Sequence, residues 1–559
     1  MSSEEMDNIS LDEPSSDCST LARTATEGSI QDWESAVSSQ IYEATFDAKV
    51  ERPQSLAGEA LFVAVICSSQ LLTQAGLALS MVPQHYIGHT FGVDDEPGKL
   101  SWFSAGYSLT VGTFILIAGR LGDVFGHKTF FVGGYVWFGL WSAVAGFAAF
   151  SDSYGFFVFC RTMQGIGPAF LLPNAIAILG RCYDPGRRQN MIFSLFGATA
   201  PGGFLLGAVF SSLLTQMAWW PWSCWILCFA CLLLAGLGSF IIPTTPAPPP
   251  EPSSTWWQRT DTLGSITGVS ALLLFNFAWN QGPVVGWPTA YTYIILLLGI
   301  FTFGAFVFVE KRLARHPLIP FATLPPESVF TLACIAAGWS SFGIFVFYAC
   351  NVLEVLRGQT PLLTSAQFSP IAVSGLCAAI TTGLALTHLR ASSVMLISMT
   401  AFLTGGIILA TVPIHQSYWA QTFVGILVLP WGMDMSFPAA TIILSRAMPR
   451  AHQGVAASLV NTFVNYSISI GLGVAGTVEG QVNREGRDLV RGFRGAFYVG
   501  VGLAGLGVAL ALTFCFVERV RVTFTLREAQ GTPTTVEKGV KGKGKAKERS
   551  RCESVEAVV

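Results

Sequence analysis

Residues 102–150 read WFSAGYSLTVGTFILIAGRLGDVFGHKTFFVGGYVWFGLWSAVAGFAAF. Two long apolar runs are separated here by a short charged stretch that contains Arg120, Asp123 and Lys128. An apolar run of this length is typical of a helix that crosses a bilayer, which needs about 20 residues. The stretch therefore predicts two membrane helices joined by a tight, charged turn.

The composition extends this prediction to the rest of the 559 residues. Apolar types make up 51% of the chain and charged types 12%, which is about half the charged share of a soluble protein. The mean hydropathy is +0.53, and the apolar half of the chain is enough for about fourteen spans. We expect an all-α polytopic membrane protein, which excludes a soluble enzyme, a nucleic-acid binder and a secreted disulfide scaffold.

Apolar runs mark fourteen predicted spans, and their even number puts both tails on one side of the membrane. Lys and Arg concentrate in the tails and in the loops on that side, which we therefore place in the cytoplasm. The outer loop at 481–495 is the exception, because it carries four Arg. The predicted spans cover residues 57–81, 102–119, 129–150, 155–180, 190–215, 222–243, 263–281, 290–309, 328–352, 363–387, 393–413, 418–445, 455–479 and 495–517.

Composition sets off the two ends of the chain and one segment in its middle. We expect a disordered acidic cytoplasmic tail at 1–55 and a basic cytoplasmic tail at 519–559. Between them, a Pro-rich segment that starts at 244 separates a first block of six spans at 56–243 from the spans that follow. The cysteines show no metal-binding spacing, so we expect buried thiols and no metal site.

The charged turn carries a specific motif, Gly119-Arg-Leu-Gly-Asp123-Val-Phe-Gly126-His-Lys128. Its glycines allow two helix ends to approach closely, and its charged residues can form a network at the cytoplasmic edge that holds one state of a rocking transporter. The motif resembles the signature loop of the major facilitator superfamily. The resemblance implies that conformational gating depends on Gly119, Arg120, Gly122, Asp123, Gly126 and Lys128.

Two further motifs are similar to those of this superfamily. Arg161-Thr-Met-Gln164-Gly-Ile-Gly-Pro-Ala matches its fourth-span motif, and the resemblance gives Arg161 and Gln164 a role in coupling or substrate binding. The alternative is an arginine that snorkels to the membrane surface. The fifth span resembles the Gly-rich antiporter motif of exporters, with Ala200 in place of one Gly, and helix packing alone is the alternative. The residues that carry this second resemblance are Gly197, Pro201, Gly202, Gly203 and Gly207.

The overall pattern resembles the fourteen-span drug:proton antiporter branch, and more narrowly the fungal aminotriazole-resistance-like transporters. The resemblance implies a major facilitator fold, with a six-helix bundle at 56–243, a Pro-rich linker and two additional helices at 244–327, and a second six-helix bundle at 328–518. Gln74 stands where many members of that branch carry an acid, so the usual titratable group is missing. Asp434, in the middle of the twelfth predicted span, is the best remaining proton carrier, with a structural acid as the alternative. The candidates for lining a central cavity are Tyr107, Asn174, Asn351, Asn461 and Asn465.

These features predict a transporter that exports small organic compounds, such as a drug, toxin or secondary metabolite, by proton antiport with alternating access. No ATP-binding or catalytic motif is present, so we expect neither an enzyme nor a cofactor. The expected partners are a small-molecule substrate, protons and membrane lipid, without nucleic acid, and the chain is expected to act as a monomer. We expect it in the plasma membrane, with the vacuolar membrane as the alternative. The alternative functions are a proton-independent facilitator or importer and a transport-fold sensor.

Overall fold

The computed structural model describes residues 55–183, 186–244, 255–314, 317–319, 325–447, 453–483 and 487–531. These residues form helices and contain no strand. Most of both predicted tails and the Pro-rich part of the linker lie outside the described residues. The chain separates into two compact units, Met1–Leu512 and Thr513–Val559.

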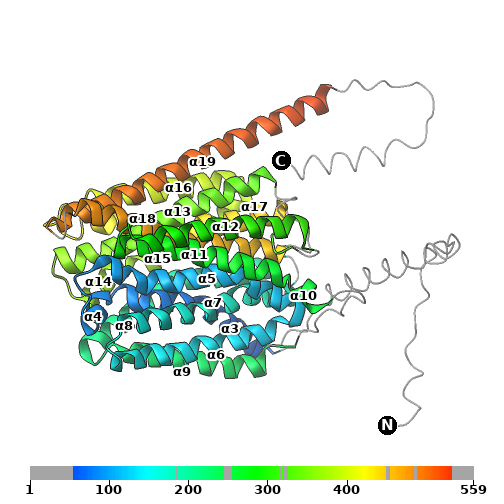
Figure 1. Cartoon of the computed structure of the whole chain (residues 1–559). Coiled ribbons are helices and arrows are strands. Elements are labelled where there is room, and N and C mark those ends of the chain that lie inside the picture. The colour runs from blue at the N-terminus through cyan, green and yellow to red at the C-terminus, as the bar shows by residue number, and fades with distance from the viewer. Residues whose placement is uncertain are drawn as a thin grey trace, which may run out of the picture. The chain divides into compact units, whose positions relative to one another are not determined.

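Fourteen helices among the described residues are long and apolar enough to cross a membrane, which confirms the predicted number (Figure 1). The first six are α3 (Leu56–Met81), α5 (Pro97–Phe125), α6 (His127–Phe147), α7 (Tyr154–Cys182), α8 (Arg187–Met217) and α9 (Pro221–Ile241). The two additional helices are α11 (Thr262–Val285) and α12 (Ala290–Arg312). The last six begin with α13 (Pro326–Asn351), α14 (Pro361–Phe368) with α15 (Pro370–His388), α16 (Ala391–Ala410), α17 (Gln421–Ala447), α18 (Gln453–Val482) and α19 (Leu489–Gly531).

Short helical segments connect or extend these spans. The helix α4 (Gln84–Thr90) follows α3, and α10 (Trp256–Arg259) precedes α11. A 3-10 turn (Ala148–Phe150) continues α6, and a π turn (Val352–Leu356) continues α13. Several of the long helices begin with proline, whose fixed φ suits the first helical position.

Two predicted span starts differ from the structure by more than one helical turn. The second span begins at Pro97 and the last at Leu489, whereas the apolar runs begin at 102 and 495. An apolar run marks only the part of a helix that lies in hydrocarbon, and these helices continue into polar sequence. Arg491 and Arg494, which were assigned to the outer loop, therefore belong to the first turns of α19.

Two clusters of buried apolar side chains correspond to the two predicted six-helix bundles. One cluster is drawn from α3 to α9 and is rich in fully buried aromatic rings, among them Phe62, Phe103 and Phe138. The other is drawn mainly from α13 to α19. The predicted fold class, two six-helix bundles with two additional helices, is thereby confirmed.

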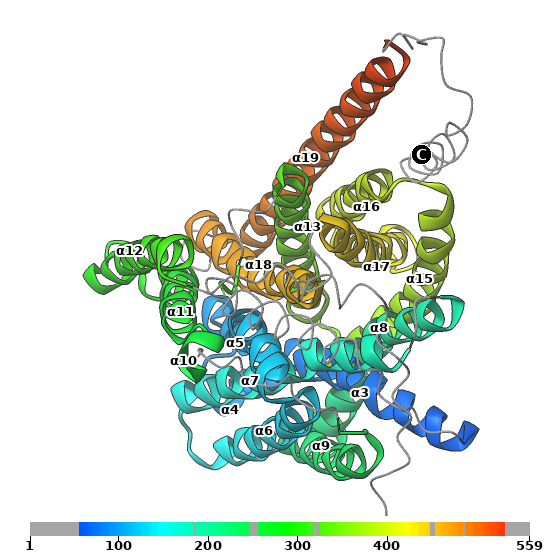
Figure 2. The ribbon, with the colours of Figure 1, turned by 90° about the vertical axis from the view of Figure 1, so that its right-hand side faces the viewer.

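One of the additional helices, α11, lies against one of the two seams between the bundles. Figure 2 shows α11 beside α5 and α18 with α12 on the outer side of α11, while α8 lies beside α15 at the other seam. Ser469 Oγ on α18 lies 2.7 Å from Asn276 Oδ1 and 3.1 Å from the Ala105 carbonyl oxygen. Ser469 Oγ also accepts from Asn280 Nδ2 at 3.2 Å. One buried polar cluster thus joins α11 to a helix of each bundle.

The described cysteines are all free thiols. Most are buried as predicted, but Cys377 on α15 is exposed. In the membrane this position faces lipid, where a thiol behaves as a small apolar group and its exposure costs little.

Candidate functional site

The predicted charged turn is almost entirely helical. Helix α5 runs through Gly119 and Asp123 to Phe125, and α6 starts at His127, so Gly126 alone makes the corner. Gly126 has a φ of 102°, which side chains with a Cβ rarely adopt. A glycine is therefore required at this corner for conformational reasons.

Asn174 of α7 clamps this corner from inside the bundle. Its Nδ2 donates to the carbonyl oxygens of Ala118 and Phe170, which leaves Oδ1 to accept from His127 Nδ1 at 2.8 Å. Gly122 packs directly against the Asn174 amide, where a Cβ would collide. Asn174, predicted to line a cavity, instead fixes the angle between α5 and α6.

The charges at the corner pair differently from the predicted network. Asp123 Oδ1 lies 3.4 Å from His127 Nε2, and Arg120 Nε donates to the Arg259 carbonyl oxygen at 2.8 Å. Among the described residues, neither Arg120 nor Lys128 forms an ion pair with Asp123. In this structure the charges are therefore satisfied by a histidine of α6 and the backbone of α10, and a network among the three charged residues stays a prediction for another state of the transporter.

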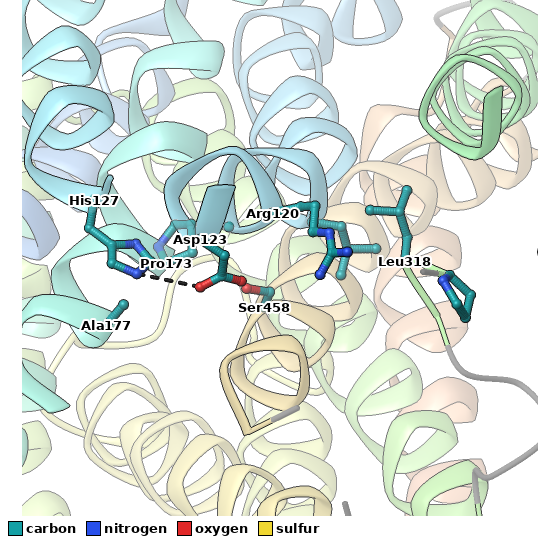
Figure 3. Close-up of a pocket in the computed structure, with 10 residues that line it drawn as sticks. Arg120, Asp123, His127, Pro173, Ala177, Leu318 and Ser458 are labelled. Atoms are coloured by element: carbon teal, nitrogen blue, oxygen red, sulfur yellow. Dashed lines mark ion pairs between the residues drawn. The ribbon is translucent and has the colours of Figure 1, made fainter. Parts of the chain in front are cut away.

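A small hollow, open to solvent, adjoins this corner. Figure 3 shows Arg120 and Asp123 from α5 together with His127, Ser458 of α18 and Leu318 from the segment before α13. The hollow therefore touches both bundles and the additional segment between them. Its lining residues are Leu116, Gly119, Arg120, Asp123, His127, Pro173, Ala177, Pro317, Leu318 and Ser458.

Arg161 is fully buried in the first bundle, which excludes the snorkelling alternative. Its guanidinium donates to the carbonyl oxygens of Gly76 at 2.8 Å and Phe103 at 3.1 Å, and to Gln164 Oε1. It also lies over the Tyr107 ring, 4.8 Å from the centroid. None of the described carboxylates forms an ion pair with it, so its charge is balanced by carbonyl and ring dipoles.

The antiporter-like helix α8 has two different faces. Gly203 and Gly207 pack on the backbone of α3, so closely that a Cβ would collide with Leu71 and Ala75. Gly197 and Gly202 face open space. Two of its glycines thus hold α8 to its own bundle.

Pro201 of α8 points to the other bundle. A Cβ built on Gly375 of α15 would lie 2.8 Å from Pro201 Cγ and 2.7 Å from Asp434 Oδ2. Three helices, α8, α15 and α17, therefore meet at one point on the seam. The Oδ2 atom of Asp434 is buried and has no hydrogen-bond partner among the described residues.

The remaining predicted residues do not gather around one cavity. Tyr107 is buried and its hydroxyl donates to the Thr73 carbonyl oxygen at 2.8 Å, and Gln74 is half-buried on α3. Asn465 Nδ2 donates to the Asn461 carbonyl oxygen at 3.0 Å within α18. These side chains belong to separate contacts in the two bundles.

Asn351, the last predicted cavity residue, links the bundles at the end opposite the charged corner. Its Oδ1 lies 3.1 Å from His85 Nε2, and His85 Nδ1 lies 3.0 Å from the Asp94 carbonyl oxygen. Burial lowers the pKa of His85, against the opposing effect of the Asp94 carbonyl. The sequence analysis missed His85, because a single histidine in a short loop helix carries no pattern.

A second link at the same end joins α8 to α14. Ser212 Oγ and Ser365 Oγ lie 2.9 Å apart, and Ser365 Oγ lies 3.0 Å from the Ala208 carbonyl oxygen. All of these atoms are buried. The two bundles are therefore tied directly together at the ends that we predict to be outer, while the hollow lies at the predicted inner end.

Comparison with known proteins agrees with this architecture. The Major Facilitator Superfamily model matches residues 64–393. The chain is 62% identical to the low affinity ammonium transporter of Saccharomyces cerevisiae, over 83% of this chain and 89% of that protein. It is 51% identical to the efflux pump terJ of Aspergillus terreus, over 82% and 89% of the two chains.

More distant matches point the same way. The aminotriazole resistance protein of S. cerevisiae is 38% identical over 80% of this chain and 82% of its own length, as the sequence resemblance predicted. A crystal structure of the peptide transporter POT has the same fold, with a TM-score of 0.58 at 15% identity over 86% and 97% of the two chains. The motifs, the two bundles and these relatives together establish that the chain is a multi-pass membrane transporter and belongs to the major facilitator superfamily.

Proposed function

We propose that this transporter exports small organic compounds in exchange for protons and that Asp434 carries the proton. The supporting observation is that Asp434 and Pro201, which belong to different bundles, both pack against Gly375 at the seam. A buried carboxyl oxygen without a hydrogen bond is costly, and such groups inside membranes are typical of proton and substrate pathways. When one bundle rocks against the other, the surroundings of this carboxyl change, as a carrier that loads on one side and unloads on the other requires.

The proposed substrate class rests on the relatives and on the charges of the site. Relatives of this chain are named as efflux pumps and as an aminotriazole resistance protein. Arg161 is fully buried and its guanidinium donates to three protein oxygen atoms, so it is not exposed to a bound anion. Asp434 is then the available charge at the seam, which favours neutral or weakly basic compounds over strong anions.

Ammonium is a second candidate substrate, favoured by the 62% identity to a protein named as a low affinity ammonium transporter. A carboxylate that accepts a proton also attracts a small cation. In this case Asp434 would bind ammonium directly, and the protein would act as an importer or facilitator. In both cases we propose that the tails lie in the cytoplasm and that the protein works as a monomer in the plasma membrane.

Purified protein in liposomes can test these functions with an imposed pH step. Aminotriazole and ammonium would be followed separately, once against their gradient and once during downhill equilibration. If Asp434 carries the proton, Asp434→Asn abolishes uphill movement but keeps downhill equilibration. Glu479→Gln is the matched control, because Glu479 lies in a neighbouring helix and already accepts a hydrogen bond from Asn483 at 2.8 Å.

The outcomes separate the alternatives. Loss of both movements in Asp434→Asn, with the control intact, would make Asp434 a structural acid. Retention of both with an unchanged pH dependence would place coupling elsewhere or show a facilitator. Movement of ammonium alone, following the membrane potential, would favour the second candidate.

A further inference from the structure

Two buried carboxyl groups meet at one end of the additional helices. Asp261 caps the N-terminus of α11, and its Oδ1 accepts from the Gly264 backbone N–H at 3.2 Å. Glu310 lies in the last turn of α12, and its Oε2 accepts from the Ile319 backbone N–H at 3.3 Å. Both residues are only 5% exposed.

The second oxygen of each carboxyl points to the same place. A Cβ built on Gly264 would touch Asp261 Oδ2 and would lie 2.8 Å from Glu310 Oε1. Both atoms are buried, and neither has a hydrogen-bond donor among the described residues. Two ionised carboxylates could not stay in this position, because each is only an acceptor and their charges repel.

No basic side chain balances this pair within the described part of the chain. Arg259 of α10 contacts Arg120 only through its backbone oxygen, and Lys311 and Arg312 of α12 are exposed. None of these four forms an ion pair with Asp261 or Glu310. A proton is the smallest ligand that satisfies both unpartnered oxygens, since it turns one acceptor into a donor to the other.

We propose that Asp261 and Glu310 form a proton-binding site that controls the docking of residues 317–319 on the corner between α5 and α6, which carries the signature motif. The Ile319 N–H is held by Glu310, and the adjoining Pro317 and Leu318 line the same hollow as the signature residues. With the shared proton bound, this segment stays docked. When the proton is lost, the two carboxylates repel and the segment leaves the hollow.

The same site is tied to the gate from a second direction. Asp261 lies two residues after Arg259, whose carbonyl oxygen accepts from Arg120 Nε of the signature motif at 2.8 Å. A displacement at the carboxyl pair therefore reaches both Arg120 and the wall of the hollow. The two additional helices thus acquire a role in gating, whatever compound the protein moves. This inference rests on the proposed function only for the topology, in which the tails lie in the cytoplasm. In that topology the carboxyl pair lies at the cytoplasmic end of the helices and responds to cytoplasmic pH.

The accessibility of a cysteine at Leu318 reports docking without any transported compound. The Leu318→Cys variant would be labelled with a thiol reagent in vesicles. Its labelling rate would be divided by the labelling rate of a second variant, Leu313→Cys, at an exposed position nearby. This ratio removes the intrinsic effect of pH on thiol reactivity. We expect the ratio to rise as the pH is raised, by up to about tenfold per pH unit where the single proton is lost.

Two variants connect this profile to the carboxyl pair. Glu310→Gln places a permanent donor beside Asp261, so the ratio should stay low at every pH, whereas Glu310→Ala should keep it high. Glu327→Gln, a change at the inner end of α13, is the matched control and should keep the wild-type profile. Arg315 and His316, which lie outside the described residues, remain unchanged in every variant.

The proposal is overturned if the wild-type ratio does not change with pH, or if Glu310→Gln retains the wild-type profile. The Gln variant keeps the test decisive even when Glu310→Ala fails to fold. Asp434→Asn should leave the labelling profile unchanged, so failure of proton antiport and failure of this sensor give different results. Setting the pH separately on each side of the vesicle membrane identifies the side from which the proton arrives.

Discussion

Replacing Arg161 with Ala tests whether this buried arginine holds the first bundle together. The guanidinium donates to Gly76, Phe103 and Gln164 in the interior. Each buried acceptor that loses its donor lowers the free energy of unfolding by about 1–3 kcal/mol. The lower value applies to the two helix carbonyls, because they keep their hydrogen bonds within the helices. With the cavity left by the side chain, we expect the free energy of unfolding to fall by about 3–5 kcal/mol. This is a large part of the total of about 5–15 kcal/mol that is typical of a folded protein.

The assay compares the amount of each variant in the membrane and its midpoint of thermal unfolding in detergent. We expect Arg161→Ala to be scarce and to unfold at a clearly lower temperature, with Arg161→Lys in between because it keeps the charge but fewer donors. Arg312→Ala, at an exposed position, is the control and should match the wild type. A normal amount and a normal midpoint in Arg161→Ala, combined with loss of transport, would refute this reasoning and assign the guanidinium to the proton or the substrate.

Three further predictions use the signature corner, helix α8 and the topology. Asp123→Asn removes the charge that faces the imidazole of the next helix, so initial transport rates should fall while the amount in the membrane stays normal. Gly203→Val should strongly reduce the amount of folded protein because it collides with the backbone of α3, whereas Gly202→Val, which meets open space, should express normally. Phe125 and Tyr86 are both 48% exposed. A cysteine at Phe125 should be labelled only from the cytoplasm, and a cysteine at Tyr86 only from outside. The opposite result would invert the topology.

The spans could be predicted from the sequence because the length of an apolar run corresponds directly to bilayer thickness. Their ends were less predictable. Pro97 starts its helix well before the apolar run, and α19 begins with polar turns that hydropathy assigns to a loop. Helix ends depend on caps and on contacts outside the hydrocarbon, which a local average does not register.

The candidate site could be located from its motifs, but its partners could not. Asp123 and Arg120 stand out in the sequence, yet the residues that they contact, His127 and Arg259, are set by the packing of α6 and α10. A polar residue on an apolar helix can face a cavity or bind another helix, and both uses leave the same pattern. Asn174 belongs to the second kind, as only its contacts in the folded chain reveal.

The position of α11 against α5 and α18 makes the transporter asymmetric toward the lipid. A compound dissolved in the bilayer could approach a two-bundle transporter sideways along either seam, but here a helix already occupies one of these routes (Figure 2). The other seam, between α8 and α15, is closed in this structure by the packing of Pro201 and Asp434 against Gly375, so a compound entering there from the bilayer would have to part these helices. For apolar compounds, the tightness of this one contact would then decide which molecules can leave the bilayer for the space between the bundles.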